Sequence, residues 1–258
     1  QTAEALNIKG DIIKADDSKE SLEILRHSCA HMMAQAIKEL YPEAKFFVGP
    51  VVKEGFYYDF KVESKISDED LPTIEKKMKE IADRKLPITR YETTKEEFYE
   101  KFKNDELKQA VLKNIKDDTL TIYKQGDFED LCRGPHLPNT RMIRSFKLTR
   151  VAGAYLGGDE KNEMITRIYG IAFFDKQALF DYTKMIEEAK KRDHRKLGTE
   201  LELFTFNDDV GAGLPMWLPN GARLRSKLEH LLYKAHRVRG YEPVRGPEIL
   251  KSEMWKIS

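Results

Sequence analysis

The stretch "HSCAHMMAQAIKELYPEAKFFVGPVVKEGFYYDF", residues 27–60, decides the fold, because its hydrophobic period changes partway along. Apolar side chains recur every three or four residues from Leu25 to Leu40, and Pro42 follows. This spacing predicts a helix that begins at Ser18 and ends before the proline. After the proline, β-forming residues alternate with glycine turns, which predicts a hairpin.

The rest of the chain continues this mixture of helices and strands. Two helices are predicted to begin at capping boxes, Ser67–Asp70 and Thr94–Glu97. Three more are predicted from apolar spacing over 107–116, 176–197 and 221–239. The predicted strands surround Tyr123, cover 146–156, and follow a Gly157-Gly158 turn. Helices and non-repeating strands in mixed order predict an α+β fold and argue against a doubly wound sheet.

Composition sets broad limits on the kind of protein. The chain has 258 residues, a length that suits one large domain or two smaller ones, and a formal net charge of +1. A nucleic-acid surface must therefore come from local patterning. Two cysteines are too few for a disulfide scaffold, which predicts a cytoplasmic setting, and the apolar runs are too short to span a membrane.

Both ends of the sequence indicate a fragment of a longer protein. The chain starts without methionine and stops where a new amphipathic segment begins. We interpret residues 1–17 as the remnant of an earlier module or as a leader.

Two pairs of side chains could do chemistry. His27 and His31 are four residues apart on a predicted helix, so both rings project from one face. Cys132 and His136 repeat this spacing across a Gly-Pro turn in "EDLCRGPHLPN", residues 129–139. The two pairs together are a moderately specific sign of one site.

Several chemistries could use these four groups. Four ligands would close a structural zinc site, whereas three would leave a position for an activated water. Without a metal, the imidazoles can position a water and carry protons near neutral pH. Asp130 offers a carboxylate that could bind an ammonium group or orient a histidine. The residues alone leave these alternatives open.

A basic stretch follows the second pair. Residues 131–158 contain no Asp or Glu, and they contain five basic residues, namely Arg133, Arg141, Arg144, Lys147 and Arg150. We predict that these side chains contact the phosphate backbone of a nucleic acid, with salt-sensitive binding.

Four stretches together resemble threonyl-tRNA synthetases: residues 27–60, "DLCRGPH" (130–136), "AGAYLGGDEKNEMITRIYG" (152–170) and "AKKRDHRKLG" (189–198). The resemblance covers about Ser18 to the last residue. It implies that residues 18–180 are an editing domain of the threonyl/alanyl type, which hydrolyses serine wrongly attached to threonine tRNA. It further implies a linker helix over 181–197 and, over 198–258, the beginning of a class II catalytic domain with an antiparallel-sheet core.

The resemblance also implies the composition of an editing pocket. The catalytic set would be His27, His31, Lys108, Asp130, Cys132 and His136, and the substrate-binding set Tyr58 and Tyr123. Lys108, His27 and His136 would hold the attacking water and stabilise the developing negative charge. Asp130 would take the substrate ammonium, and Tyr58 with His31 would crowd the extra methyl of threonine. The resemblance favours a pocket without metal, although alanine-type relatives hold zinc through a similar quartet.

Cofactors and partners follow from the same resemblance. Zinc, ATP and magnesium are implied for the full-length enzyme, as are a homodimer and the acceptor end of threonine tRNA, whereas the fragment itself should not aminoacylate. Two other interpretations compete with editing. One is a zinc-binding hydrolase or zinc-stabilised module; the other is a non-catalytic RNA-binding or dimerisation fragment that uses the basic stretch and the 221–239 helix.

Overall fold

The computed structural model describes residues 15–16, 18–113, 115, 119–207, 209–211 and 213–246. The chain divides into two compact units, Gln1–Thr183 and Lys184–Ser258, which we call unit 1 and unit 2. Most of the predicted leader at 1–17 and the segment 247–258 lie outside the described residues. No helix within the described ranges has both the length and the apolar character needed to cross a membrane.

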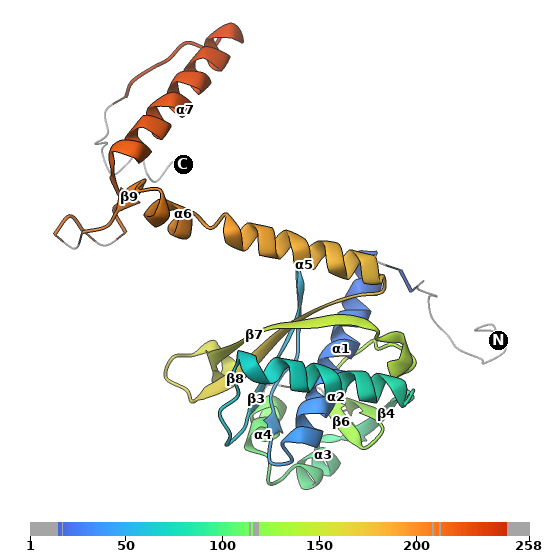
Figure 1. Cartoon of the computed structure of the whole chain (residues 1–258). Coiled ribbons are helices and arrows are strands. Elements are labelled where there is room, and N and C mark those ends of the chain that lie inside the picture. Colours follow the sequence, from blue (N-terminus) through green and yellow to red (C-terminus); the bar gives the residue numbers. More distant parts are fainter. Residues whose placement is uncertain are drawn as a thin grey trace. The chain divides into compact units, whose positions relative to one another are not determined.

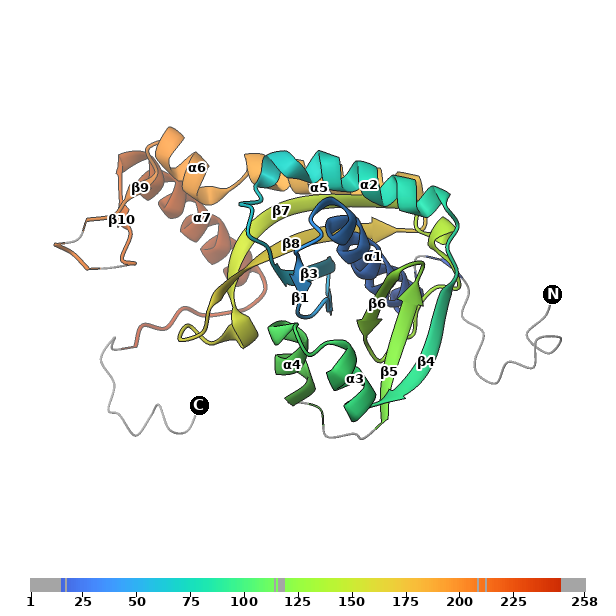
Figure 2. The same ribbon diagram turned by 90° about the horizontal axis from the view of Figure 1, so that it is seen from below.

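Helix α1 (Lys19–Leu40) forms the centre of unit 1. The predicted helix is confirmed: Ser18 is the N-cap residue, and the helix ends at Tyr41, directly before Pro42. Its middle is buried on all sides, including polar residues such as Ser28 and Gln35. A helix buried all round must be enclosed by other elements. Figure 2 shows α1 between the sheet that contains β3, β7 and β8 and the strands β4, β5 and β6.

The larger sheet of unit 1 is antiparallel. Its strand order is β1-β3-β8-β7, and β2 also pairs with β3. The bounds are β1 Lys45–Phe46, β2 Val51–Val52, β3 Gly55–Lys61, β7 Ser145–Tyr155 and β8 Met164–Phe173. The hairpin predicted after Pro42 is confirmed by the pairing of β2 with β3. The predicted Gly157-Gly158 turn joins β7 to β8, and both glycines have positive φ, which glycine adopts without strain.

Helix α2 (Leu71–Asp83) contacts α1 and the edge strand β7, and Figure 1 shows it crossing α1. The capping box of Ser67 and Asp70 begins a short 3-10 turn, Asp68–Asp70, that leads into α2. The free edge of β7 is covered by carboxylates: the backbone N–H of Leu148 donates to Glu75 at 2.7 Å, and that of Val151 to Asp68 at 2.6 Å. These contacts occupy donors that an edge strand would otherwise expose.

A second sheet of unit 1 has the order β4-β5-β6. It comprises β4 Ile88–Thr94, β5 Thr119–Gln125 and β6 Phe128–Leu131; the nearby helices are α3 Lys95–Lys101 and α4 Glu106–Lys113. A small separate core contains Phe98, Leu120 and Ile122. We did not predict β4 or β6, because β4 is half exposed and β6 is four residues long with two acids. Pairing with β5 forms both strands. The α+β prediction is confirmed.

One predicted helix, which includes the boundary between the units, is corrected. The helix expected over 176–197 is two helices, α5 Lys176–Lys191 and α6 His194–Glu200. Asp193 separates them, because its carboxylate accepts a hydrogen bond from the N–H of Arg195 at 2.8 Å and so begins α6. Gly198, the residue after the predicted end of this helix, lies inside α6, buried against the Phe204 ring. Unit 2 also contains β9 Phe204–Thr205, β10 Met216–Trp217 and α7 Pro219–Val238.

Candidate functional site

Four predicted side chains from two distant segments meet in unit 1. The metal-binding atoms of His27, His31, Cys132 and His136 all lie within 4.8 Å of one another. The His136 ring lies at the centre, with its centroid 4.3 Å from those of both His27 and His31. We call these four residues the His/Cys cluster. His31 is buried, and the other three are half-buried.

Backbone hydrogen bonds bring the second pair to α1. Cys132 directly follows strand β6, and its N–H donates to the Thr121 carbonyl of β5 at 3.2 Å. The loop then turns back toward α1, where the N–H of Leu137 donates to the Ser28 hydroxyl at 2.9 Å. The loop is therefore fastened on both sides of Cys132 and His136.

Ser28, which we did not predict, determines the tautomer of His136. Its hydroxyl donates its single hydrogen to the Ile24 carbonyl at 2.9 Å, because a carbonyl can only accept. The Ser28 oxygen therefore accepts from Nδ1–H of His136, 3.1 Å away. His136 Nε2 then carries the lone pair, and it lies 2.9 Å from Cys132 Sγ. The sequence did contain a signal for Ser28: it is a small polar residue between His27 and His31, on a helix face predicted to be buried.

The histidines are neutral near physiological pH. Burial lowers the pKa of His136 to about 3. Burial also lowers the pKa of His31 well below its usual value, and the neighbouring rings and Lys108 act in the same direction. The pKa of His27 is lowered less, because a hydrogen bond to the backbone of Pro135 partly opposes burial. Neutral imidazoles can accept a proton or bind a metal.

Cys132 is a thiol and not a thiolate. Burial raises its pKa to about 12, and the nearby Asp130 adds to the effect. The reactive nucleophile of cysteine is the thiolate. We therefore assign Cys132 to the wall of the site, where its S–H faces the lone pair of His136.

Lys108 and Asp130 are paired with each other. Both are almost wholly buried, with side chains 4% and 2% exposed. The Asp130 carboxylate accepts hydrogen bonds from Lys108 Nζ, from the Tyr58 hydroxyl and from the N–H of Leu131. Burial lowers the pKa of Lys108 to about 8 and raises that of Asp130, while the Leu131 N–H favours the carboxylate. An ammonium ligand of Asp130 would have to compete with Lys108.

Tyr123 lies on the loop side of the cluster. Its ring centroid is 4.4 Å from that of His136. Gly134 has φ +67°, and a Cβ at this position would overlap the Tyr123 hydroxyl. Glycine is therefore required here both for the backbone conformation and for the close approach of the ring.

A cavity of about 470 Å³ opens beside His27. Apolar groups of Ile24, Pro50, Val51, Gly134 and Pro135 line it, together with Glu20 and Glu23 of α1. The rim thus combines two exposed carboxylates with an imidazole of the cluster. We did not predict these two acids, although Glu20, Glu23 and His27 have helical spacing.

The basic stretch is exposed, but it is not free of acids in space. Arg133, Arg141, Arg144, Lys147 and Arg150 are all exposed. Arg144 pairs with Asp83 of α2 at 2.8 Å, and Arg150 lies over the Tyr169 ring at 4.2 Å. Together with Asp68 and Glu75 at β7, Asp83 brings negative charge to a segment that has none in sequence. The predicted role of the basic residues in tRNA binding stays a prediction.

The cluster suits zinc by the type of its donors, because three imidazoles and one cysteine are common zinc ligands. Its geometry is not that of a bound ion. Ligands of one tetrahedral zinc lie roughly 3.3–3.6 Å apart, given bonds of about 2.0–2.3 Å. Cys132 Sγ and His136 Nε2 are closer than this, at 2.9 Å. Zinc binding would open this contact and deprotonate the thiol.

Comparisons with known proteins agree with the predicted resemblance. Residues 120–169 match the family described as the threonyl and alanyl tRNA synthetase second additional domain. A threonine–tRNA ligase of Campylobacter lari is 73% identical over 94% of this chain and 40% of its own length. Those of Campylobacter jejuni and Nautilia profundicola are 70% and 67% identical over 100% of this chain and 42% of their own length. The chain spans about two fifths of the length of these curated relatives.

Proposed function

We propose, starting from the similarity of this chain to part of the threonine–tRNA ligases, that unit 1 is an editing domain that hydrolyses mischarged seryl-tRNA. The observation that carries the proposal is the convergence of three neutral imidazoles and a thiol beside a cavity. Water would add to the carbonyl of the aminoacyl ester, and the ester C–O bond would then break. The ribose oxygen would leave with a proton, giving serine and free tRNA.

The need for such a site follows from the chemistry of the two amino acids. Threonine differs from serine by one methyl group, which is worth about 1–3 kcal/mol in a pocket. A synthetic site that grips the shared hydroxyl therefore discriminates only about 10- to 200-fold. A second and smaller pocket can remove serine products while excluding threonine. Tyr58 and His31 are the groups that we propose to restrict this pocket. Both are buried, and neither lines the cavity beside His27.

His27 is the base that we favour. One of its ring nitrogens is held by the backbone of Pro135, so the other is available, and the ring lines the cavity. The lone pair of His136, by contrast, faces Cys132. His27 would take a proton from the attacking water and return it to the leaving ribose oxygen. Lys108 remains an ammonium at neutral pH but does not line this cavity, so it would stabilise the negative charge that develops on the ester oxygen at a distance and not by direct contact.

The substrate ammonium has two candidate partners. Asp130 is the partner we predicted from the resemblance, but Lys108 and Tyr58 already occupy its carboxylate. Glu20 and Glu23 lie at the rim of the cavity and give it a negative potential. This potential favours the aminoacyl group over a phosphate at the mouth. The exposed basic stretch would then hold the tRNA backbone.

Deacylation of seryl-tRNA by the 258-residue chain tests the proposal. We expect turnover of seryl-tRNA, little of threonyl-tRNA, and loss of turnover in His27→Ala. His230→Ala on the exposed face of α7 is the matched control and should behave like the wild type. Lys108→Ala should lower turnover more than binding. Binding of seryl-tRNA without turnover would reject editing and favour the RNA-binding interpretation.

Zinc binding is the second candidate, which the donor set of the cluster favours. His27, His31, Cys132 and His136 would hold the ion, and a closed set of four ligands would stabilise the fold without activating water. Metal analysis of protein purified without chelator decides this question. Stoichiometric zinc that disappears in Cys132→Ala would support it; wild-type protein that lacks zinc and hydrolyses seryl-tRNA would reject it.

The activity of the longer protein is also an inference. The names of the relatives indicate a ligase that joins threonine to tRNA. From the resemblance described above, we infer that ATP, magnesium and zinc are used outside this chain. We infer that unit 2 begins the catalytic domain of that ligase and that the whole protein is a dimer. Aminoacylation by a longer chain, and its absence in this one, is the direct test.

A further inference from the structure

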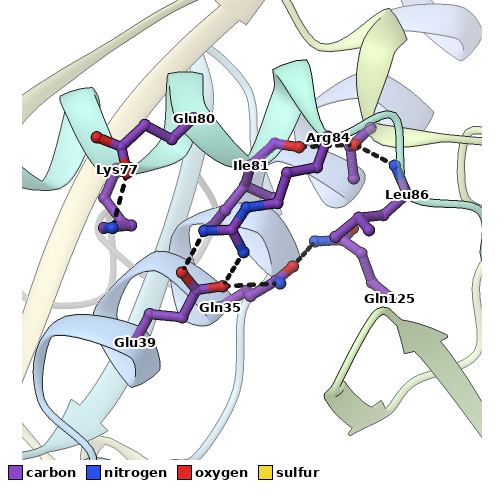
Figure 3. A network of polar contacts seen from close by, with 9 residues as sticks. Gln35, Glu39, Lys77, Glu80, Ile81, Arg84, Leu86 and Gln125 are labelled. Atoms are coloured by element: carbon purple, nitrogen blue, oxygen red, sulfur yellow. Dashed lines mark hydrogen bonds and ion pairs between the residues drawn. The ribbon is translucent and has the colours of Figure 1, made fainter.

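A hydrogen-bonded network that runs from the surface into the core connects the helix that carries the histidines to the hairpin that carries Asp130 and Cys132. Figure 3 shows it: Arg84, the C-cap residue of α2, donates two hydrogen bonds to Glu39, and Gln35 Nε2 donates to the same carboxylate at 3.1 Å. Gln125, the last residue of β5, then donates through Nε2 to Gln35 Oε1 at 2.6 Å. Gln35 and Gln125 are only 4% and 2% exposed.

The Glu39 carboxylate fixes which group donates and which accepts in each hydrogen bond of this network. The Glu39 carboxylate can only accept, so Gln35 must present its NH₂ group to it. Gln35 therefore presents its oxygen to Gln125, which must donate. As a result, Gln125 Oε1 is buried without a donor. Among the described residues, it is the wholly buried side-chain nitrogen or oxygen atom that has no hydrogen-bond partner among the protein's own groups.

This arrangement is poor for stability. A buried amide oxygen without a donor loses the hydrogen bonds it had to water. Two apolar side chains of similar shape at these positions would avoid that loss, because replacing both partners of a buried hydrogen bond is nearly neutral or stabilising. What the amide pair provides is a directional contact that permits one relative position of its two elements.

The position of the pair on α1 shows what it aligns. Ser28, His31 and Gln35 follow one another at spacings of three and four residues, so they lie on one face of the helix. Ser28 binds the loop at His136 and Leu137, and Gln35 binds the β5–β6 hairpin, about 10 Å further along the helix. The two attachments lie on either side of His31. They fix both the rotation and the axial position of α1 relative to Cys132 and His136.

We infer that Gln35 and Gln125 are positioning residues that align the histidines of α1 with the cysteine and histidine of the loop. The inference rests on the proposed editing function for its consequence in catalysis. It concerns geometry, however, and can be tested without activity. The amides do not touch the reacting atoms, so their effect acts through His31 and the hairpin.

The test compares the double variant Gln35→Met/Gln125→Met with the wild-type chain. Methionine has nearly the shape of glutamine and removes both amides together. We expect a melting temperature equal to or above that of the wild type, and a single variant Gln125→Met that is less stable, because it leaves Gln35 Oε1 without a donor. Gln177→Met is the control, since this exposed glutamine bonds only within α5, to Asp181.

Two readouts separate positioning from stability. Ring-proton NOEs between His31 and His136, whose centroids are 4.3 Å apart, should weaken in the double variant. The kcat for seryl-tRNA should fall about 100-fold with KM nearly unchanged, as for a displacement of about 1 Å. Unchanged NOEs, or a double variant that is less stable than the single one, would overturn the inference. A wild-type chain that does not hydrolyse seryl-tRNA would reject the editing proposal, while the NOEs would still decide this one.

Discussion

Lys108→Met removes the ammonium that faces the buried Asp130 carboxylate. The two side chains are 4% and 2% exposed, so water cannot replace the lost partner without opening the structure. The Tyr58 hydroxyl and the Leu131 N–H would still donate to the carboxylate. Removing one partner of a buried ion pair typically costs about 3–5 kcal/mol of unfolding free energy. Because two neutral donors remain, we expect about 3 kcal/mol at pH 7, where Lys108 is still an ammonium.

The cost should shrink as the pH falls. Burial already raises the pKa of Asp130, and loss of the neighbouring ammonium raises it further. A carboxyl whose pKa is higher in the folded than in the unfolded state gains a proton on folding. Between the raised value and the unfolded value of 3.8, stability therefore increases on acidification. For each unit by which the pKa of Asp130 in the folded variant exceeds the pH, about 1.4 kcal/mol of unfolding free energy is restored.

Urea unfolding followed by far-UV circular dichroism at pH 7 and pH 5 measures this loss. In Lys108→Met/Asp130→Asn, the amide oxygen still accepts from Tyr58, and most of the stability should return. Lys191→Met, which breaks an exposed pair with Glu188, is the matched control and should change stability by less than about 1 kcal/mol. A loss of the same size at both pH values, or no recovery in the double variant, would refute an ion pair between Lys108 and Asp130.

Three further predictions concern the loop and its cysteine and histidine. In thermal unfolding, Gly134→Ala should destabilise the chain by at least about 1 kcal/mol more than Gly157→Ala. The backbone φ is +67° and +68° at the two sites, but only Gly134 has a ring, that of Tyr123, against it. Equal losses of stability would contradict the clash with Tyr123. Alkylation of Cys132 at pH 8 should be at least ~100-fold slower than that of a free thiol, because the pKa of Cys132 is about 12. An alkylation rate near that of an unhindered thiol would refute the prediction. The unfolding free energy of the wild-type chain should fall as the pH falls from 6.5 toward 3, because His136 in the unfolded chain takes up a proton that the folded ring, with a pKa of about 3, does not accept. Urea unfolding at pH 7 and pH 4.5 measures this change. If a His136→Gln variant loses the same free energy between these pH values, His136 is not its origin.

The sequence alone was sufficient for the features that depend on neighbouring residues. The period of α1, the proline that ends it and the capping box of Thr94 and Glu97 are local, and the structure confirms each of them. The pairs at 27/31 and 132/136 were also visible as equal spacings, and their convergence was predicted. Long ordered motifs identified the resemblance that the comparisons then confirmed.

Tertiary structure decided what each polar group bonds to. Asp130 was expected to meet a substrate ammonium, yet Lys108 and Tyr58 occupy it from two other elements. The segment 131–158 contains no acids, yet Asp83 reaches it from α2. These partners lie tens of residues away, and no local period or cap specifies them. A buried polar group must find its partner wherever the packed elements bring one within about 3 Å, so its identity is settled only when the whole core has formed.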